Sequence, residues 1–270
     1  MCCPFHMDTM ATSAAAVDDL SHAWAVQHAS WNGGKMDNWV PAHRASNGNT
    51  DGPLTMAYYT RADLPFHYAL ADAFTICDAC HCSVMAPTNP NRLYGWTGTI
   101  DPGGKNGGPV IDNSETPPYT WTTYPERLQA AGISWKNYQE PDTGDDNPLA
   151  WFAQYQKAPP SSPLYRYGMA TALVISPFST GGRIYREVAD YTSTIRFMER
   201  LFGVEEPNIS AWRRKTCSDF TGALNLRPDR RGSFPGLPPT RDYLLRQYIT
   251  SQDQSPPTVP AVQSLPTQEH

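Results

Sequence analysis

The stretch from Pro65 to Gly98 constrains the fold most, because a proline divides it into two helix-forming segments. From Tyr68 to Ser83, apolar residues recur at helical spacing with no Gly or Pro between them, which predicts a helix. Pro87 cannot continue a helix and restricts the residue before it, so the chain must change direction there. Thr88 suits an N-cap and Pro90 suits the first turn, so a second helix is predicted to begin at Thr88.

The start of this second helix has the residue types of an anion site. A hydroxyl at a helix N-terminus, with Arg92 one turn further on, suits a phosphate group because backbone amides and a guanidinium both attract negative charge. The same position would ease the formation of an alkoxide nucleophile at Thr88. An ordinary N-cap explains the same threonine and is its commoner role. Spacing alone therefore leaves both interpretations open.

Residues 65–92, which read PFHYALADAFTICDACHCSVMAPTNPNR, resemble the bacterial phosphatidylcholine-hydrolysing phospholipase C family, which includes an acid phosphatase branch. The family belongs to the alkaline phosphatase-like superfamily, so the resemblance implies an α/β three-layer sandwich with a central mixed sheet, incomplete in this chain. It also implies a hydroxyl nucleophile within Pro87–Arg92, which we assign to Thr88. Asn91, Arg92 and His81 are then expected to bind the substrate.

A second stretch, residues 19–37, reads DLSHAWAVQHASWNGGKMD and resembles the same family. The resemblance implies a catalytic role for His22, and substrate binding by Asn32 and Lys35, because such side chains could bind a phosphate oxygen or protonate a leaving alkoxide. A structural histidine or a turn residue is the alternative for each, and we favour it for His28. Local composition predicts a helix over Ala14–Val26, followed by a tight turn from Trp31 to Asp37.

Composition excludes some classes of partner. The formal charge of −5 argues against nucleic acid as the main partner, and no apolar run is long enough to span a membrane. No secretory signal is visible, so the chain as given is expected in the cytoplasm, although the family it resembles is exported.

Three of the six cysteines lie close together in sequence. Cys77, Cys80, His81 and Cys82 have the residue types of a zinc site, but no second CxxC or HxxxH pair is present to complete one. We therefore interpret these thiols as core residues. Residues 99–118 are rich in Gly, Pro, Asn and Asp, and we interpret them as a loop.

After residue 170 the chain resembles a part of the family sequence that lies further downstream. The segment ATALVISPFSTGG resembles a strand and loop that the family places far downstream, which implies an internal deletion near 167–171. Thr171–Ser176 is predicted as a buried strand, and Thr192–Phe202 as an amphipathic helix stopped by Gly203. We expect a phosphoesterase domain over 1–226 and a Pro-rich flexible tail over 227–270.

At residues 190–193, where the family has Asp-His-Thr-Ser, this chain has Asp-Tyr-Thr-Ser. Two further family segments are missing: an N-terminal ENRSFDH-type run and a YDEN-type carboxylate strand. They supply most of the family's ligands for a divalent metal ion. The resemblance thus implies a divalent metal cofactor whose site is incomplete here; its ligands stay unassigned, with Thr88 as a candidate.

The implied function is phospholipase C-type hydrolysis of a phosphoric ester, foremost the phosphodiester of phosphatidylcholine, through a covalent phosphothreonine. The substrate is then a phospholipid or another phosphate ester, and contact with a membrane is expected to be peripheral. Two alternatives stay open. One is an acid phosphatase-like phosphomonoesterase, and the other is a non-catalytic truncated remnant that lacks most of the metal site.

Overall fold

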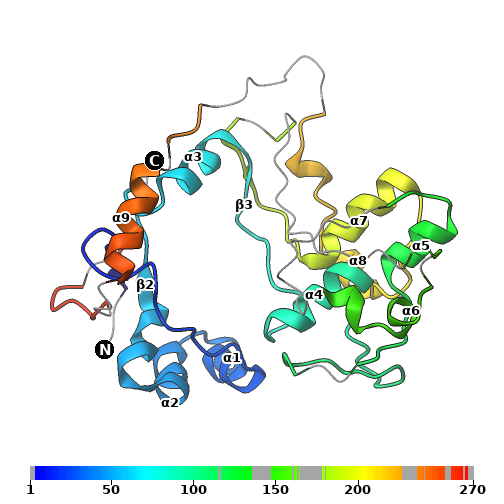
Figure 1. The fold of residues 1–270 in the computed structure, drawn as a ribbon, viewed down its shortest axis with the longest axis horizontal. Coiled ribbons are helices and arrows are strands. Elements are labelled where there is room, and N and C mark those ends of the chain that lie inside the picture. Colours follow the sequence, from blue (N-terminus) through cyan, green and yellow to red (C-terminus); the bar gives the residue numbers. More distant parts are fainter. Residues whose placement is uncertain are drawn as a thin grey trace. The chain divides into compact units, whose positions relative to one another are not determined.

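A computed structural model describes residues 4–114, 117–135, 147–159, 161–162, 164, 178–179, 181–226, 236–239, 241–252, 257–263 and 265–266. The chain divides into two compact units: unit 1, Met1–Phe74 with Ser233–His270, and unit 2, Thr75–Gly232. The described residues form a mixed α/β structure with two small parallel sheets (Figure 1). The strand predicted at Thr171–Ser176 and the junction at 167–171 lie outside the described residues.

Unit 1 is built around a parallel pair of short strands, in which Phe5 pairs with Ala57 and His6 with Tyr58. Helices α1 and α2 pack against each other in this unit (Figure 1). Its elements in chain order are β1 (Phe5–His6), α1 (Trp24–Trp31), η1 (Asn32–Gly34), α2 (Trp39–Asp51), η2 (Gly52–Met56), β2 (Ala57–Tyr58), α3 (Pro65–Ala73) and α9 (Arg241–Gln252).

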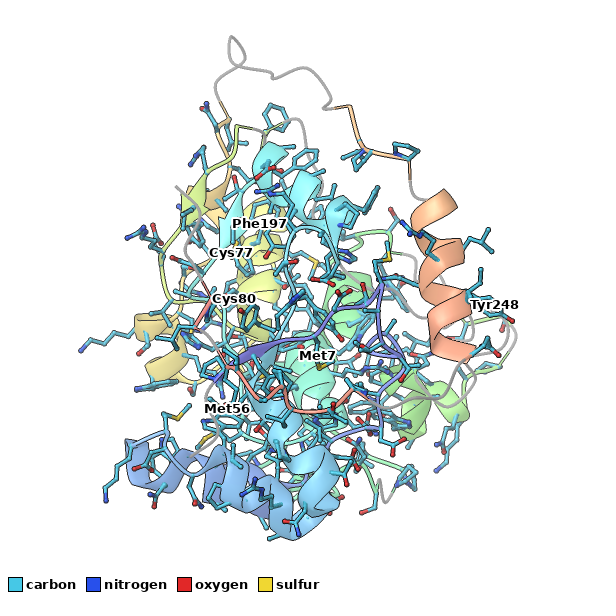
Figure 2. The ribbon with its side chains drawn as sticks, turned by 90° about the vertical axis from the view of Figure 1, so that its left-hand side faces the viewer. Met7, Met56, Cys77, Cys80, Phe197 and Tyr248 are labelled. Atoms are coloured by element: carbon cyan, nitrogen blue, oxygen red, sulfur yellow. The ribbon has the colours of Figure 1, made fainter. Side chains whose placement is uncertain are left out.

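The core of unit 1 forms around the first strand. Phe5, Met7, Ala14 and Leu54 are buried together, and Met56 packs on them (Figure 2 labels Met7 and Met56). The prediction of a helix over Ala14–Val26 is wrong, because α1 begins only at Trp24. The start of the predicted helix folds into turns instead, where Thr12 Oγ1 accepts a 3.3 Å bond from the Ala14 amide and the Ser13 carbonyl accepts a 2.8 Å bond from the Ala16 amide. Such local side-chain bonds compete with helix formation.

Helix α9 lies inside residues 227–270, which composition predicts to be a Pro-rich flexible tail. Gln247 Nε2 donates a 3.2 Å hydrogen bond to the Asp63 carbonyl, and Val259 packs on the core of unit 1. Residues 241–252 of the predicted tail therefore form a helix, and Gln247 of this helix contacts the rest of unit 1.

Unit 2 contains the second parallel pair, in which Ile76 pairs with Ile184 and Cys77 with Tyr185. This pairing corrects the helix predicted over Tyr68–Ser83, because α3 ends at Ala73 and the next residues join a strand. The elements of unit 2 are β3 (Ile76–Cys77), α4 (Thr88–Thr97), α5 (Tyr124–Ala130), η4 (Pro148–Trp151), α6 (Ala153–Gln156), β4 (Ile184–Tyr185), α7 (Tyr191–Phe202), α8 (Ala211–Thr216) and η6 (Thr221–Ala223).

Helices α4 and α7 pack against each other; α4 begins where it was predicted to begin, and α7 begins and ends close to its predicted limits. Helix α4 begins at Thr88 as predicted, although the capping position itself is Pro87. Helix α7 begins after Asp190, whose carboxylate accepts a 2.9 Å bond from the Thr192 amide, and ends at a left-handed Gly203. Both helices are thus delimited by local chemistry.

Gly98, which ends α4, should be sensitive to any side chain. Its φ of +72° is left-handed, and a Cβ there would lie 2.7 Å from Ile209 Cγ1. We expect Gly98→Ala to lower the free energy of unfolding by about 2–4 kcal/mol, from backbone strain plus overpacking. Gly132 is a matched control, because it has the same φ of +72° and nothing within 4 Å of a Cβ. Equal losses for both variants in urea titrations would show that the Ile209 contact contributes nothing.

Candidate functional site

Thr88 is exposed at the first position of α4, directly after a buried turn. The amide of the next residue, Asn89, donates a 3.0 Å hydrogen bond to Asn113 Oδ1 in a neighbouring loop. Pro90 follows in the first turn, where the missing N–H costs no helical hydrogen bond. The sequence therefore places an accessible hydroxyl at a helix N-terminus, where the amide dipoles favour negative charge.

The Asn91 side chain fixes the shape of the turn before Thr88. Its Oδ1 accepts a 3.1 Å bond from the Val84 amide, and its Nδ2 lies 3.0–3.1 Å from the carbonyl oxygens of Val84, Ala86 and Pro87. Asn91 is buried, so these bonds form out of water and losing them would leave polar groups unsatisfied. In the described structure Asn91 supports the turn, and its role in substrate binding stays a prediction.

Arg92 shares its surroundings with Tyr191 and two thiols. Partial burial raises the pKa of Tyr191, the Cys82 and Cys80 thiols act in the same direction, and the positive charge of Arg92 acts against it. Arg92, Cys80 and Cys82 thus each contribute to the electrostatic environment of Tyr191. His81 is exposed in the same segment, which is held by a 2.8 Å bond from its amide to the Ala189 carbonyl.

Arg213, which the sequence analysis did not single out, ties this region together. Its guanidinium bonds to the Asp190 carboxylate and to the Ser83 carbonyl, and lies 4.1 Å from the centre of the Tyr94 ring. The Tyr191 amide also bonds to Ser83 Oγ at 3.1 Å. Arg213 thereby connects α8, the start of α7, α4 and the segment before Thr88. The signal in the sequence was the basic run after Ser210, which caps α8.

The remaining predicted site residues belong to unit 1. His22 Nε2 lies 2.9 Å from Asp19 Oδ1, and both side chains are exposed, so this pair contributes little stability. Asn32 ends α1 in a left-handed conformation and donates a 2.8 Å bond to Asp37 Oδ1. Lys35 is exposed in the same turn. The predicted turn is therefore present, whereas shared use of one site with Thr88 stays a prediction.

His28 has the structural role predicted for it. Its Nδ1 lies 2.8 Å from the Trp24 carbonyl oxygen, and its ring stacks on Trp24 with centroids 4.1 Å apart. A histidine engaged on both sides in this way supports α1.

The cysteines differ from their predicted role. Cys80 and Cys82 are exposed, so the interpretation as core thiols is wrong for these two, while Cys217 is buried. The reason is that the chain leaves the helical path after Ala73, and Cys80 forms an isolated bridge to Ala189.

Within the described part of the chain, no group of three or more His, Cys, Asp or Glu side chains is placed to bind a metal ion. Carboxylates, imidazoles and thiolates are the side chains that usually hold divalent metals. The described residues therefore do not fit a divalent metal site.

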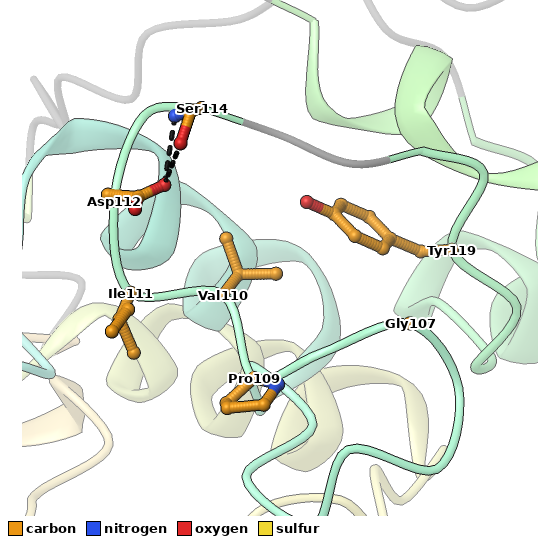
Figure 3. A pocket seen from close by; sticks show the side chains of 7 residues that line it. All are labelled: Gly107, Pro109, Val110, Ile111, Asp112, Ser114 and Tyr119. Atoms are coloured by element: carbon orange, nitrogen blue, oxygen red, sulfur yellow. Dashed lines mark hydrogen bonds between the residues drawn. The ribbon is translucent and has the colours of Figure 1, made fainter.

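A small cavity lies beside the loop that contacts the start of α4. Its volume is about 230 Å³, and seven residues line it (Figure 3): Gly107, Pro109, Val110, Ile111, Asp112, Ser114 and Tyr119. Asp101 holds the preceding turn, because its Oδ2 accepts bonds from the amides of Asn106 and Gly108 at 2.7 and 3.0 Å. Burial raises the pKa of Asp101, but these amide bonds outweigh burial and lower it overall.

The model of the Phosphoesterase family matches residues 1–172. The chain is 34% identical over 396 residues to a non-hemolytic phospholipase C of Pseudomonas aeruginosa, covering 98% of this chain and 56% of that protein. It is 31% identical over 415 residues to a protein of the same name from Burkholderia pseudomallei, and the alignment covers 98% of this chain and 57% of that protein. It is 44% identical over 180 residues to phospholipase C A of Mycobacterium tuberculosis, and the alignment covers 62% of this chain and 34% of that protein.

The chain thus spans about half the length, or less, of these curated relatives. No helix among the described residues is both long and apolar enough to cross a membrane. The family match covers well over half of the chain and includes the segment around Thr88. The chain therefore belongs to the Phosphoesterase family.

Proposed function

We propose that this chain carries the nucleophile region of a phospholipase C that hydrolyses the head-group phosphodiester of phosphatidylcholine. The observation that carries the proposal is the exposed hydroxyl of Thr88 at the start of α4, on a turn fixed by Asn91. Family membership and relatives named phospholipase C support the same chemistry.

In the proposed reaction, Thr88 Oγ attacks phosphorus and the bond from phosphorus to the diacylglycerol oxygen breaks. The hydroxyl proton is taken up by a base, and the departing oxygen gains a proton, for which His22 is our candidate donor. Phosphorylcholine is then held on Thr88 as a phosphodiester. Water attacks the same phosphorus, releases phosphorylcholine and restores the hydroxyl. Arg92 would bind the negatively charged phosphoryl oxygens, and Asn32, Lys35 and His81 are further candidates for this role.

We also propose that the chain is a shortened member of an alkaline phosphatase-like sandwich fold. The parallel pairing of β1 with β2 and of β3 with β4 is consistent with parts of such a sheet. An alignment of 396 residues with a chain of 270 must contain gaps where the relative has additional residues. The family match ends at residue 172, close to the proposed deletion near 167–171.

The test is hydrolysis of p-nitrophenyl phosphorylcholine by the purified chain, with and without divalent metal ions. We expect Thr88→Ala to lower turnover by about 10³-fold or more, since the reaction loses its nucleophile, and Thr88→Ser to keep part of it. Thr120→Ala, an exposed threonine of the same unit, is the matched control. Turnover unaffected by Thr88→Ala would overturn the assignment.

The same assay separates the alternatives. Faster hydrolysis of p-nitrophenyl phosphate than of the diester would favour the phosphomonoesterase. A chain that unfolds cooperatively in urea but shows no turnover above the Thr88→Ala background would be the non-catalytic remnant.

A further inference from the structure

The cavity lined by Gly107, residues 109–112, Ser114 and Tyr119 combines the negative charge of Asp112 with apolar walls. Val110 and Tyr119 face each other across it, with Asp112 and Ser114 near one end and Pro109 near the other (Figure 3). The hydroxyl end of the Tyr119 ring points into this space (Figure 3). The cavity is thus lined by a carboxylate, a phenolic oxygen and aliphatic side chains.

The Asp112 carboxylate and the Tyr119 ring are both held in place by the fold. Asp112 Oδ1 accepts bonds from the Ser114 amide at 3.0 Å and from its hydroxyl at 2.6 Å, which fixes the carboxylate. The Tyr119 ring is buried against Trp121 and Phe152, with centroids 4.9 and 5.7 Å apart. A preorganised site of this kind does not have to order its side chains when a ligand binds.

This chemistry suits a cation whose surface is apolar. A quaternary ammonium group carries a full positive charge on methyl groups and donates no N–H hydrogen bond, so it needs a negative charge and aliphatic or aromatic contact. A primary ammonium group would instead need several acceptors placed around it. At about 230 Å³ the cavity is smaller than the ~300–1,000 Å³ of drug-sized sites, so it suits a head group rather than a whole lipid.

A hydrogen bond links the loop that lines the cavity to the start of α4. Asn113, between Asp112 and Ser114 in sequence, accepts the 3.0 Å hydrogen bond from the Asn89 amide. Asn89 directly follows Thr88, so the cavity loop and the start of α4 are held together.

We propose that the cavity lined by Val110, Asp112 and Tyr119 binds the quaternary ammonium of a choline head group while the attached phosphoryl group lies at Thr88. This inference rests on the proposed function for its second half, and adds to it a site for the head group. Asp112 supplies the charge, and Pro109, Val110 and Ile111 contact the methyl groups.

The test is ligand-observed NMR titration of the full chain with choline, ethanolamine and 3,3-dimethyl-1-butanol, the uncharged analogue of choline. We expect saturable binding of choline, with ethanolamine and the uncharged analogue about tenfold weaker or more. Asp112→Asn should weaken choline binding by about tenfold, because the charge is lost while the shape is kept. Asp78→Asn, at another exposed carboxylate of unit 2, should leave it unchanged.

Asp112→Asn could weaken binding simply by disturbing the loop, so a second pair of variants tests the cavity without changing Asp112. Ile111→Lys adds a positive charge beside the cavity and should also weaken choline binding, whereas Ile76→Lys, at another exposed isoleucine, should not. Equal binding of choline and its uncharged analogue, or equal choline binding by the unmodified chain and both cavity variants, would overturn the proposal. Choline binding is measured without turnover, so the titration tests the cavity even if Thr88 proves not to be the nucleophile.

Discussion

Replacing Asp63 with alanine is expected to lower the stability of unit 1 by about 3–5 kcal/mol, because a buried carboxylate there holds two distant segments. Its Oδ1 accepts bonds from the Thr9 amide and hydroxyl at 3.0 and 3.2 Å. Its Oδ2 accepts from the Thr60 amide and hydroxyl at 2.7 and 2.6 Å, and lies 2.7 Å from His6 Nε2. Asp63→Ala leaves the buried amide and hydroxyl of Thr9, and the half-buried ones of Thr60, without their acceptor.

The same carboxylate should make stability depend on pH. Burial raises the pKa of Asp63, but the bonds from Thr60, Thr9 and His6 outweigh burial and hold it well below its ordinary value of 3.8. Because the pKa of Asp63 is lower in the folded than in the unfolded state, the ionised carboxylate stabilises the fold at pH values above its unfolded-state pKa. This contribution is progressively lost as the pH falls below about 4. Asp63→Ala should therefore lose more stability at pH 7 than at pH 3.

Urea titrations at pH 7 and pH 3, followed by circular dichroism, measure both effects. Asp72→Ala is the control, because Asp72 pairs with Arg61 on the surface at 2.6 Å and should contribute at most about 1 kcal/mol. A loss at Asp63 no larger than that at Asp72, or a loss equal at the two pH values, would contradict this account.

Arg213→Met is expected to destabilise unit 2 by about 3–5 kcal/mol, because it leaves the Asp190 carboxylate buried without its counter-charge. The variant also loses the bond to the Ser83 carbonyl and the contact with the Tyr94 ring. Turnover should fall with it, because Ser83 and Tyr94 flank the segment that presents Thr88. Thermal or urea unfolding measures the first effect, and the chromogenic assay the second.

Two further variants test the cause. Arg213→Met combined with Asp190→Asn should regain part of the stability, because the unpaired charge is gone while a polar N-cap remains on α7. Arg200→Met removes a more exposed pair, with Asp219 at 2.7 Å, and should cost at most about 1 kcal/mol. A double variant less stable than Arg213→Met alone would exclude the unpaired charge as the cause.

Elements specified by nearby residues could be predicted from the sequence. Helix α4 starts after Pro87 and α7 stops at Gly203, because proline geometry and a left-handed glycine act within one turn. The helix expected over Tyr68–Ser83 was wrong beyond Ala73, since Ile76 pairs with Ile184, more than a hundred residues away. Strand pairing at that separation leaves no periodic signal in the local sequence.

The candidate site shows the same division. Thr88 and Arg92 could be proposed from a local pattern, and both lie on α4 as expected. The connections of Arg213 could not, because its partner Ser83 lies 130 positions earlier in the chain. Residues 99–118 were interpreted only as a loop, and the cavity there depends on the distant burial of Tyr119 against Phe152.

The bonds made by Asn91 have a consequence for how the chain folds. All of its partners lie within seven residues, from Val84 to Pro87. Contacts of such low sequence separation have a small loop-closure cost and form early. The Asn91 bonds that shape the turn presenting Thr88 therefore join residues close in sequence and involve neither sheet, whereas Arg213 and Asn113 tie the same segment to the rest of unit 2.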